Sequence, residues 1–544
     1  MPDEMTTEPG IAEPVPPAGF TRPASQPAAL PENDDIVDCL VIGTGAGGAP
    51  LLARLARAGL RVLALEAGAW HDPKRDFATD EYAQGYLFWN DECLSAGQDP
   101  LAMGHNNSGI GVGGTTLHYT AYTPRPRADD FHLHRDFGQG VDWPLTYDEL
   151  VPYYEELEQF LGVSGPSPYP WEPGRRPYPL APLPLNGAAQ LMQRGCAKLG
   201  LRTSPAANAA LSAPYYQEGV GWRAVCTNRG FCQAGCSTGA KASMDVTFVP
   251  LALYYGAQVR PNCFVTEIER DAQGLVTGVI YTQNGAQKRQ RCRHLFLCAG
   301  TVQTPRLLLL NELALGSGQV GRNLMAHNGI QVWGTFPEEV RPNKGIPGSL
   351  ISEDTHRPKD ADFAGGYLLQ SIGVMPVTFA EQVARGRRLW GQPLRNHMRY
   401  YNHAAGINIL GDCLPHADNF LELADEKDAR GLSKPRLYFS SQANEQRLTA
   451  HAEKLMRGIW AAAGATDIWA FPRFAHVIGT ARMGQSGDDA VVDRDGRSFE
   501  VPNLYICDNS VFPSALSANP ALTIMALSLR TADRFLARQQ RRDA

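Results

Sequence analysis

Three of the eleven cysteines crowd one polar, glycine-containing segment, at Cys226, Cys232 and Cys236. Three thiolates on one loop can ligate an iron–sulfur cluster or zinc, because both favour sulfur ligands. Structural zinc sites and four-iron clusters normally take four ligands, whereas this loop supplies three. Three unconnected free thiols are the alternative interpretation. The spacing makes residues 226–236 a candidate metal loop and leaves cluster, zinc and free thiols open.

A glycine-rich turn near the N-terminus is the second chemical pattern. An apolar run leads into Gly43, Gly45 and Gly48, and a small-residue run and a second apolar run follow, ending at Glu66. This order predicts a strand, a turn, a helix and a second strand. The glycines allow the tight turn, let the backbone approach a pyrophosphate, and let the helix pack close to the strand. Glu66 stands at the spacing of a ribose 2′-hydroxyl acceptor. The pattern predicts a dinucleotide site without distinguishing FAD from NAD.

Two further segments place polar residues where ligands bind. Residues 109–118 carry several glycines followed by threonines and a histidine, which suits a backbone lying against a flat or charged ligand, with a plain loop as the alternative. Asp508 ends a strand-like run, where open α/β sheets place ligand contacts. Asn519 before Pro520 predicts the start of a long helix, whose positive end could stabilise an electron-rich ring.

Composition limits the classes of function. The chain of 544 residues has a formal net charge of −6, which argues against a nucleic-acid partner. No apolar run reaches the length of a membrane span. The first 35 residues have no apolar core of a secretory signal, so we expect a cytoplasmic protein by default and no disulfide framework. Short strand-like runs over 330–440 predict a mostly antiparallel sheet on the substrate side.

Six motifs in one order make the chain resemble the glucose–methanol–choline (GMC) flavoprotein oxidoreductases. They lie at residues 43–48 with Glu66, 111–116, 300–305, 320–324, 476–484, and 508 with 519–520. The resemblance covers nearly all of the chain from about residue 35. It implies an α/β fold with a Rossmann-like FAD-binding domain and a second, substrate domain built on a mostly antiparallel sheet. The dinucleotide is therefore expected to be FAD.

The domain boundaries follow from the same comparison of patterns. Residues 1–34 are expected to form a flexible, proline-rich extension, and 226–236 the cysteine loop. The FAD-binding domain is expected at 35–70, 101–128, 237–330 and 471–544. The substrate domain is expected at 71–100, 129–225 and 331–470.

The resemblance also implies a catalytic pair. His476 matches the catalytic histidine of the family, and Asn519 matches the position held there by His or Asn. Oxidation of an alcohol requires removal of its hydroxyl proton while hydride leaves carbon for flavin N5. A histidine can accept that proton near neutral pH, and an asparagine can hold the same oxygen in line. Without the resemblance, an ordinary histidine and a plain helix cap would be the simpler interpretations.

The implied cofactor contacts extend over the whole chain. They are Gly43, Gly45, Gly48, Glu66, Gly113, Gly114, Thr115, His118, Val265, Ala299 and Asp508. His118 stands where pyranose oxidases carry a histidine bonded covalently to FAD, whereas other members have Asn about here and bind FAD without a bond. Covalent and non-covalent attachment therefore both stay open.

The cysteine loop resembles that of bacterial, membrane-associated GMC dehydrogenases acting on glucose, fructose or gluconate. It implies a 3Fe–4S cluster at Cys226, Cys232 and Cys236 that relays electrons to an acceptor protein. We therefore expect an FAD-dependent dehydrogenase of a sugar, glycoside or polyol, with a small chaperone-like subunit as a possible partner and periplasmic location if the two are co-exported. The alternatives are a peroxide-forming pyranose-type oxidase, a hydroxynitrile-type lyase and a non-catalytic FAD-binding protein.

Overall fold

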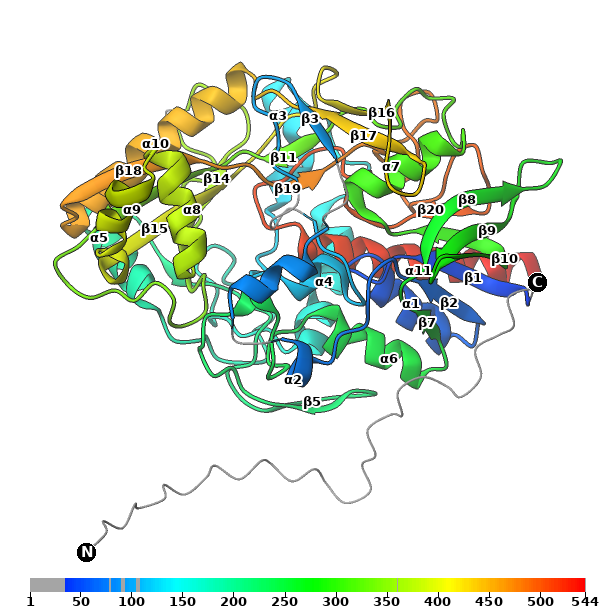
Figure 1. Cartoon of the computed structure of the whole chain (residues 1–544), viewed down its shortest axis with the longest axis horizontal. Helices are drawn as coiled ribbons and strands as arrows, with labels where there is room; N and C mark the ends of the chain where they lie inside the picture. The colour runs from blue at the N-terminus through cyan, green and yellow to red at the C-terminus, as the bar shows by residue number, and fades with distance from the viewer. Residues whose placement is uncertain (1–34, 78–79, 90–92, 104–107, 360, 544) are drawn as a thin grey trace, which may run out of the picture.

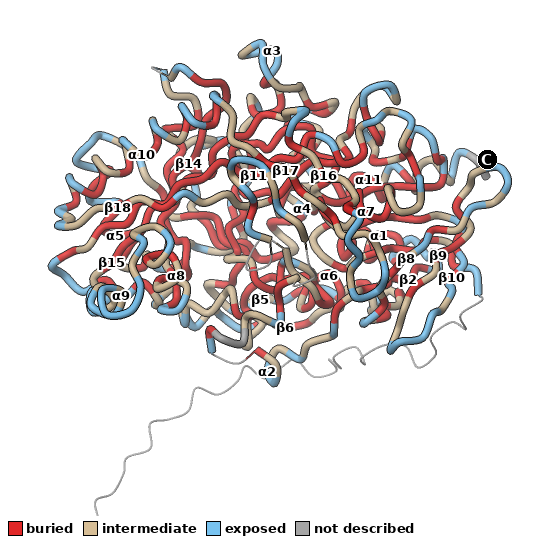
Figure 2. Tube along the Cα trace, turned by 45° about the horizontal axis from the view of Figure 1, so that its top comes forward, coloured by how far each residue is buried: buried red, intermediate tan, exposed pale blue. Residues whose placement is uncertain are grey.

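Two sheets at opposite ends of the molecule organise the chain (Figure 1). The computed structural model describes residues 35–77, 80–89, 93–103, 108–359 and 361–543, and the extension expected at 1–34 lies outside them. Buried residues follow the strands of both sheets, and exposed residues collect in peripheral loops and in α9 (Gly391–Met398) (Figure 2). The predicted α/β class with a second, mostly antiparallel sheet is confirmed.

Five parallel strands form one part of the seven-stranded sheet. Their order is β7 (Gln258–Arg260), β2 (Val62–Leu65), β1 (Val37–Ile42), β10 (Ala286–Leu297) and β20 (Leu504–Ile506). After β1 the chain continues to β2 on one side, and after β10 it continues to β20 on the other side. The connections that follow these two neighbouring strands therefore run in opposite directions from their carboxyl ends. Doubly wound sheets bind their ligands in the crevice at such a switch point.

The strand β10 belongs to two structures at once. Its first half pairs antiparallel with β9 (Val276–Gln283), which pairs with β8 (Phe264–Arg270), so that β9 and β10 form a hairpin. Its second half pairs parallel with β1 and β20. The hairpin therefore supplies the central strand of the parallel sheet.

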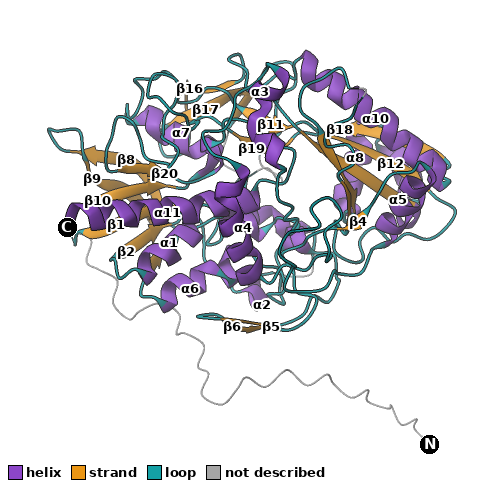
Figure 3. Ribbon diagram, turned by 180° about the vertical axis from the view of Figure 1, so that it is seen from behind, coloured by secondary structure: helices purple, strands orange, loops and turns teal. Residues whose placement is uncertain are grey.

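Two helices cover one face of the parallel sheet side by side (Figure 3). They are α1 (Gly48–Arg57) and α11 (Ala521–Asp543), and both start where the sequence predicts a helix. A Cβ on Gly48 would lie 1.9 Å from the Gly43 carbonyl oxygen, so only glycine lets α1 start this close to the turn. α4 (Tyr147–Leu161) contacts α11, and α6 (Phe248–Tyr254) contacts α1.

The second sheet has six strands, and all of its neighbouring pairs are antiparallel. Their order is β18 (Asp467–Pro472), β12 (Ile330–Thr335), β15 (Ala404–Gly411), β14 (Tyr367–Ile372), β13 (Leu350–Ser352) and β4 (Ser204–Pro205). Alternate residues such as Val332, Leu369 and Ile407 pack on α5 (Gly187–Lys198) and α10 (Ala443–Ala463). Since strand side chains alternate between faces, the intervening residues face away from these helices.

One predicted strand of this sheet lies elsewhere. The run at 436–440 was expected in one antiparallel sheet with the other runs of 330–440, but β17 (Ser433–Tyr438) pairs with β16 (Phe420–Lys427) and β3 (Leu94–Ala96), next to α7 (Gly300–Leu310). The short turn after β16 closes a local hairpin, which fixes the partner of β17 before any distant strand can.

The remaining elements are short, with one exception, α8. They are α2 (Pro73–Asp76), α3 (Leu133–Phe137), α8 (Pro376–Gly386), β5 (Tyr215–Gln217), β6 (Gly221–Arg223), β11 (Met325–His327) and β19 (Ala475–Ile478). Over the described part of the chain, no helix is both long enough and apolar enough to cross a membrane.

Candidate active site

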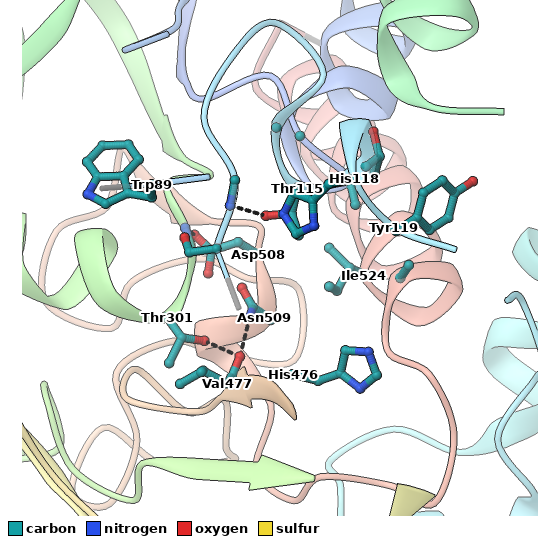
Figure 4. A pocket seen from close by; sticks show the side chains of 18 of the residues that line it. Trp89, Thr115, His118, Tyr119, Thr301, His476, Val477, Asp508, Asn509 and Ile524 are labelled. Carbon is teal, nitrogen blue, oxygen red and sulfur yellow. Dashed lines mark hydrogen bonds between the residues drawn. The ribbon is translucent and has the colours of Figure 1, made fainter. Parts of the chain in front are cut away.

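One large cavity lies between the two sheets. Its wall is formed by residues of the parallel sheet and of the six-stranded sheet, among them Ile42, Leu65, Gln331 and Asn408. Eleven predicted residues line it: Gly43, Gly45, Glu66, Gly114, Thr115, His118, Val265, Ala299, His476, Asp508 and Asn519. Figure 4 shows Thr115, His118, Asp508 and His476 around this space. The cavity therefore brings together predicted residues from the whole length of the chain.

The two predicted glycine-rich segments touch each other at one end of the cavity. A Cβ on Gly114 would lie 2.6 Å from the Cα of Gly45, so the close contact leaves no room for a side chain on Gly114. Gly48 and Gly113 lie behind this contact, and the Gly113 N–H donates to Thr44 Oγ1 at 3.2 Å. The glycines thus leave a bare backbone surface facing the cavity.

Thr44 is a residue that the sequence analysis missed. Its N–H and its hydroxyl both donate to Glu66 Oε2, at 3.0 and 2.8 Å, and the Gly68 N–H donates to Oε1 at 3.1 Å. Burial raises the pKa of Glu66, although these hydrogen bonds oppose the rise. Glu66 therefore fixes the turn as well as facing the cavity.

Asp508 joins the end of β20 to the start of α7. Its Oδ2 accepts from the Gly300 N–H at 2.8 Å and from the Thr304 hydroxyl at 2.6 Å, and its Oδ1 accepts from the Ser510 N–H at 2.8 Å. Burial raises the pKa of this carboxyl despite the hydrogen bonds. These bonds hold Ala299, which precedes α7, against the cavity.

His118 presents a neutral ring to the same cavity. The side chain is buried, and its Nε2 has no hydrogen-bond partner among the described residues. Its ring stands edge-on to Phe88, with 5.1 Å between the ring centroids. Burial, helped by the nearby Lys241 ammonium, lowers the pKa of His118 to about 3. An unpartnered buried nitrogen at a cavity wall fits a group that contacts a cofactor.

His476 pairs with a second histidine that sequence reasoning did not select. Its Nδ1 lies 3.1 Å from Nδ1 of His327 on β11, and His327 Nε2 lies 2.8 Å from the Leu516 carbonyl oxygen. His476 and Leu516 have left-handed φ angles of 55° and 64°, and such strained non-glycine residues cluster at functional sites. In the sequence, His327 follows shortly after the family motif at residues 320–324.

This pair fixes where the protons lie. A carbonyl only accepts, so His327 Nε2 carries the proton and its Nδ1 is the acceptor. His476 Nδ1–H must then donate to it, which leaves a lone pair on His476 Nε2. Burial lowers the pKa of His327 to about 4 and, with the charges of His327 and Arg473, lowers that of His476 well below 6.5. Both rings are therefore neutral near pH 7.

Asn519 is more than a helix cap. Its Oδ1 accepts a hydrogen bond from Gln370 Nε2 at 2.6 Å, and both side chains line the same cavity as His476. Gln370 lies on β14 of the second sheet, far from Asn519 in the chain, which is why no local pattern could reveal the contact. This bond joins the start of α11 to the six-stranded sheet.

The cysteine loop reaches the cavity through Gln233, next to Cys232, although its three sulfurs do not line it. Nowhere in the described ranges do three His, Cys, Asp or Glu side chains meet as ligands of one metal ion. Burial raises the pKa of Cys226, and that of Cys232 to about 12. Burial also acts on Cys236, but hydrogen bonds outweigh it and lower its pKa.

Comparison with known proteins identifies the family. A model of the N-terminal part of the GMC oxidoreductases matches residues 92–329, and a model of their C-terminal part matches residues 415–528. The chain belongs to the GMC oxidoreductase family. This membership supports FAD as the cofactor and an alcohol or sugar as the substrate.

Relatives of known activity span nearly the whole chain. The fructose dehydrogenase large subunit of Gluconobacter japonicus is 30% identical over 92% of this chain and 97% of its own length. The 2-methyl-1,2-propanediol dehydrogenase of Mycolicibacterium austroafricanum is 29% identical over 92% and 95%. Among solved structures, pyridoxine 4-oxidase from Mesorbium loti aligns with a TM-score of 0.64 at 15% identity, over 92% of this chain and 99% of that chain. At this identity the structural likeness speaks for the fold alone.

The neutral, buried histidines predict how stability depends on pH. Below pH 6.5 a histidine that stays neutral in the fold becomes protonated in the unfolded chain. The free energy of unfolding therefore decreases as the pH is lowered, by about 1.4 kcal/mol per pH unit for each such group. For His327 this loss runs from pH 6.5 down to its folded pKa of about 4. We expect the Tm to drop less between pH 7 and pH 5 in His327→Asn than in the wild type. Equal drops in thermal unfolding would contradict a depressed pKa at His327.

Proposed function

We propose that the protein is an FAD-dependent dehydrogenase that oxidises a CH–OH group of a sugar, glycoside or related polyol and passes the electrons to an acceptor other than oxygen. One observation carries the proposal: a neutral His476, with its Nε2 lone pair unused, lines the same cavity as the residues expected to hold FAD. Membership of the GMC family supports the reaction type. The two dehydrogenase relatives, which by name act on fructose and on a diol, support the substrate class.

The chain's own residues perform the proton chemistry in this proposal. FAD, when bound, supplies the acceptor for the hydride. His476 Nε2 accepts the hydroxyl proton of the substrate as the hydride leaves, because its ring is neutral and its other nitrogen is occupied. Asn519 uses its Nδ2–H to hold the same oxygen, since its Oδ1 is bound to Gln370.

His327 acts in the proposal as a positioning residue. It touches no substrate, but its bond to the Leu516 carbonyl makes its Nδ1 an acceptor, and this forces the tautomer of His476. A histidine with the other tautomer would carry its proton on Nε2 and could not take one from the alcohol. The strained backbone of Leu516 aims the carbonyl that starts this chain of bonds.

The FAD site follows from the same cavity. The turn at 43–48, Glu66, residues 113–115 and Asp508 would hold the dinucleotide, and Val265 and Ala299 would contact it. We extend the proposal to a covalent bond at His118, supported by its buried, unpartnered Nε2 at the cavity wall.

The cysteine loop is the proposed route of electron transfer to the acceptor. Cys226, Cys232 and Cys236 would hold a 3Fe–4S cluster, which supplies one-electron transfer when bound. Support comes from three half-buried thiols on one loop whose Gln233 reaches the cavity. The raised pKa values of Cys226 and Cys232 mean that these thiols need the charge of a metal to ionise. The fructose dehydrogenase relative is named as a large subunit, which supports a partner subunit for this chain.

Variants of the two histidines test the base and its positioning. We expect His476→Ala to lower the anaerobic rate of flavin bleaching by at least about 100-fold, because no base remains. His327→Leu should lower it by about tenfold or more, whereas His327→Asn, whose Oδ1 still accepts from His476, should stay near the wild type. Because the pKa of His476 lies below 6.5, the wild-type rate should persist as the pH falls through 6.5.

Stopped-flow absorbance with the sugar that bleaches the flavin fastest makes these measurements, and the flavin spectrum reports FAD content. Full bleaching by His476→Ala would rule this residue out as the base. Equal rates in the Leu and Asn variants at His327 would leave His476 as base and remove the positioning role.

Denaturation tests the bond at His118. We expect flavin fluorescence to migrate with the wild-type chain on a denaturing gel, since a covalent link survives unfolding. His118→Asn should release all of its flavin on denaturation while the folded variant still binds FAD through the remaining contacts. Free flavin from the denatured wild type would show that the attachment is non-covalent.

Metal analysis of the purified holoenzyme tests the cysteine loop. We expect about three iron atoms per chain, with labile sulfide. Cys232→Ser should lose the iron yet keep bleaching by substrate, and Cys93→Ser, outside the loop, should keep both. Absence of iron together with stoichiometric hydrogen peroxide would favour the oxidase alternative.

A further inference from the structure

Three neighbouring strands of the six-stranded sheet carry carboxamides in one row. Gln331 of β12 lies opposite Asn408 of β15, and Asn408 lies opposite Gln370 of β14. Residues opposite one another on antiparallel strands project from the same face, and all three side chains line the cavity. We propose that this amide row binds the hydroxyl groups of a polyhydroxylated substrate. The inference deepens the proposed function and rests on it.

The row starts next to the proposed chemistry. Gln370 Nε2 donates to Asn519 Oδ1 at 2.6 Å, so one end of the row is a single hydrogen bond from the residue that holds the reacting oxygen. Two strand spacings separate Gln370 from Gln331, a span of about 10 Å. A substrate whose carbinol lies at Asn519 therefore extends its neighbouring carbons over Asn408 and toward Gln331.

Two of the three amides in the row have hydrogen-bonding groups that no described residue of the protein satisfies. Gln331 is 0% exposed, and its Oε1 accepts from Trp333 Nε1 at 3.2 Å, but its Nε2 has no partner among the described residues. The half-buried Asn408 amide likewise makes no hydrogen bond within the described ranges. Burial of an unpaired amide is costly, and a ligand oxygen that accepts from it removes that cost.

The chemistry of the row selects the class of ligand. Each carboxamide both donates and accepts, as a hydroxyl does, and the row carries no charge. Leu410 and Ile372, two residues beyond Asn408 and Gln370 on the same strands, add apolar contacts at the cavity wall that suit the C–H groups of a carbon chain bearing hydroxyls. A hydrocarbon alcohol would leave the amides desolvated and unpaired, and sites built for hydrogen bonds reject such analogues strongly.

The test compares substrates on the holoenzyme by anaerobic flavin reduction. The panel is D-fructose, D-glucose, glycerol and 1-butanol. We expect the wild type to be reduced by a sugar at lower concentrations than by 1-butanol. In Gln331→Leu and Asn408→Leu the KM for that sugar should rise about 10- to 100-fold with kcat little changed, because hydrogen bonds present in both ground and transition state are lost.

Controls separate recognition from damage. Gln446→Leu, an exposed amide on α10, should keep wild-type kinetics, and the flavin spectrum reports folding of each variant. If the buried Gln331 variant does not fold, Asn408→Ala, which only shortens a half-buried side chain, carries the test. Unchanged KM values for the sugar, or an equal rise for 1-butanol, would overturn the amide row while leaving the dehydrogenase proposal intact. A wild-type flavin that no member of the panel reduces would overturn both.

Discussion

This structure depends on one constraint: the backbone of the first glycine-rich turn lies directly against the backbone at the ends of two later strands, with no side chain between them. A Cβ on Gly47 would lie 1.8 Å from the Cys507 carbonyl oxygen, and one on Gly43 would lie 2.5 Å from that of Cys298. The turn can exist only if the ends of β10 and β20 come to it as bare backbone. One small patch of main chain thus draws together residues hundreds of positions apart, and Gly43, Ala299 and Asp508 face the cavity at this junction.

Burial without compensating charge gives the site its electrostatic character. The carboxyls of Glu66 and Asp508 have raised pKa values because they are buried, and both are held by backbone N–H groups and hydroxyls instead of cations. The rings of His118, His327 and His476 are neutral for the same physical reason. Proton positions are consequently set by hydrogen bonds, and the Leu516 carbonyl decides the tautomers of two histidines.

Local patterns sufficed for much of the fold and failed where contacts join distant segments. The opening strand–turn–helix unit and α11 were predictable because periodicity, caps and glycines act within a few residues. Thr44, His327 and Gln370 were missed because each acquires its role from a partner far away in sequence. The run at 436–440 lies outside the sheet expected for it, because strand pairing depends on turn closure, which apolar spacing alone does not encode. A geometry for the metal ligands is likewise not visible in Cys-x5-Cys-x3-Cys, because spacing does not say how sulfurs converge.

The alternation of side chains along β12, β14 and β15 has an evolutionary and practical consequence. Residues that face α5 and α10 hold the sheet in place, whereas Gln331, Gln370 and Asn408, on the opposite face, line the cavity. The stability of the sheet and the selectivity for substrate therefore depend on different positions of the same strands. A lineage, or a designed library, that varies only the cavity-facing positions can change the preferred molecule while the packed face stays untouched.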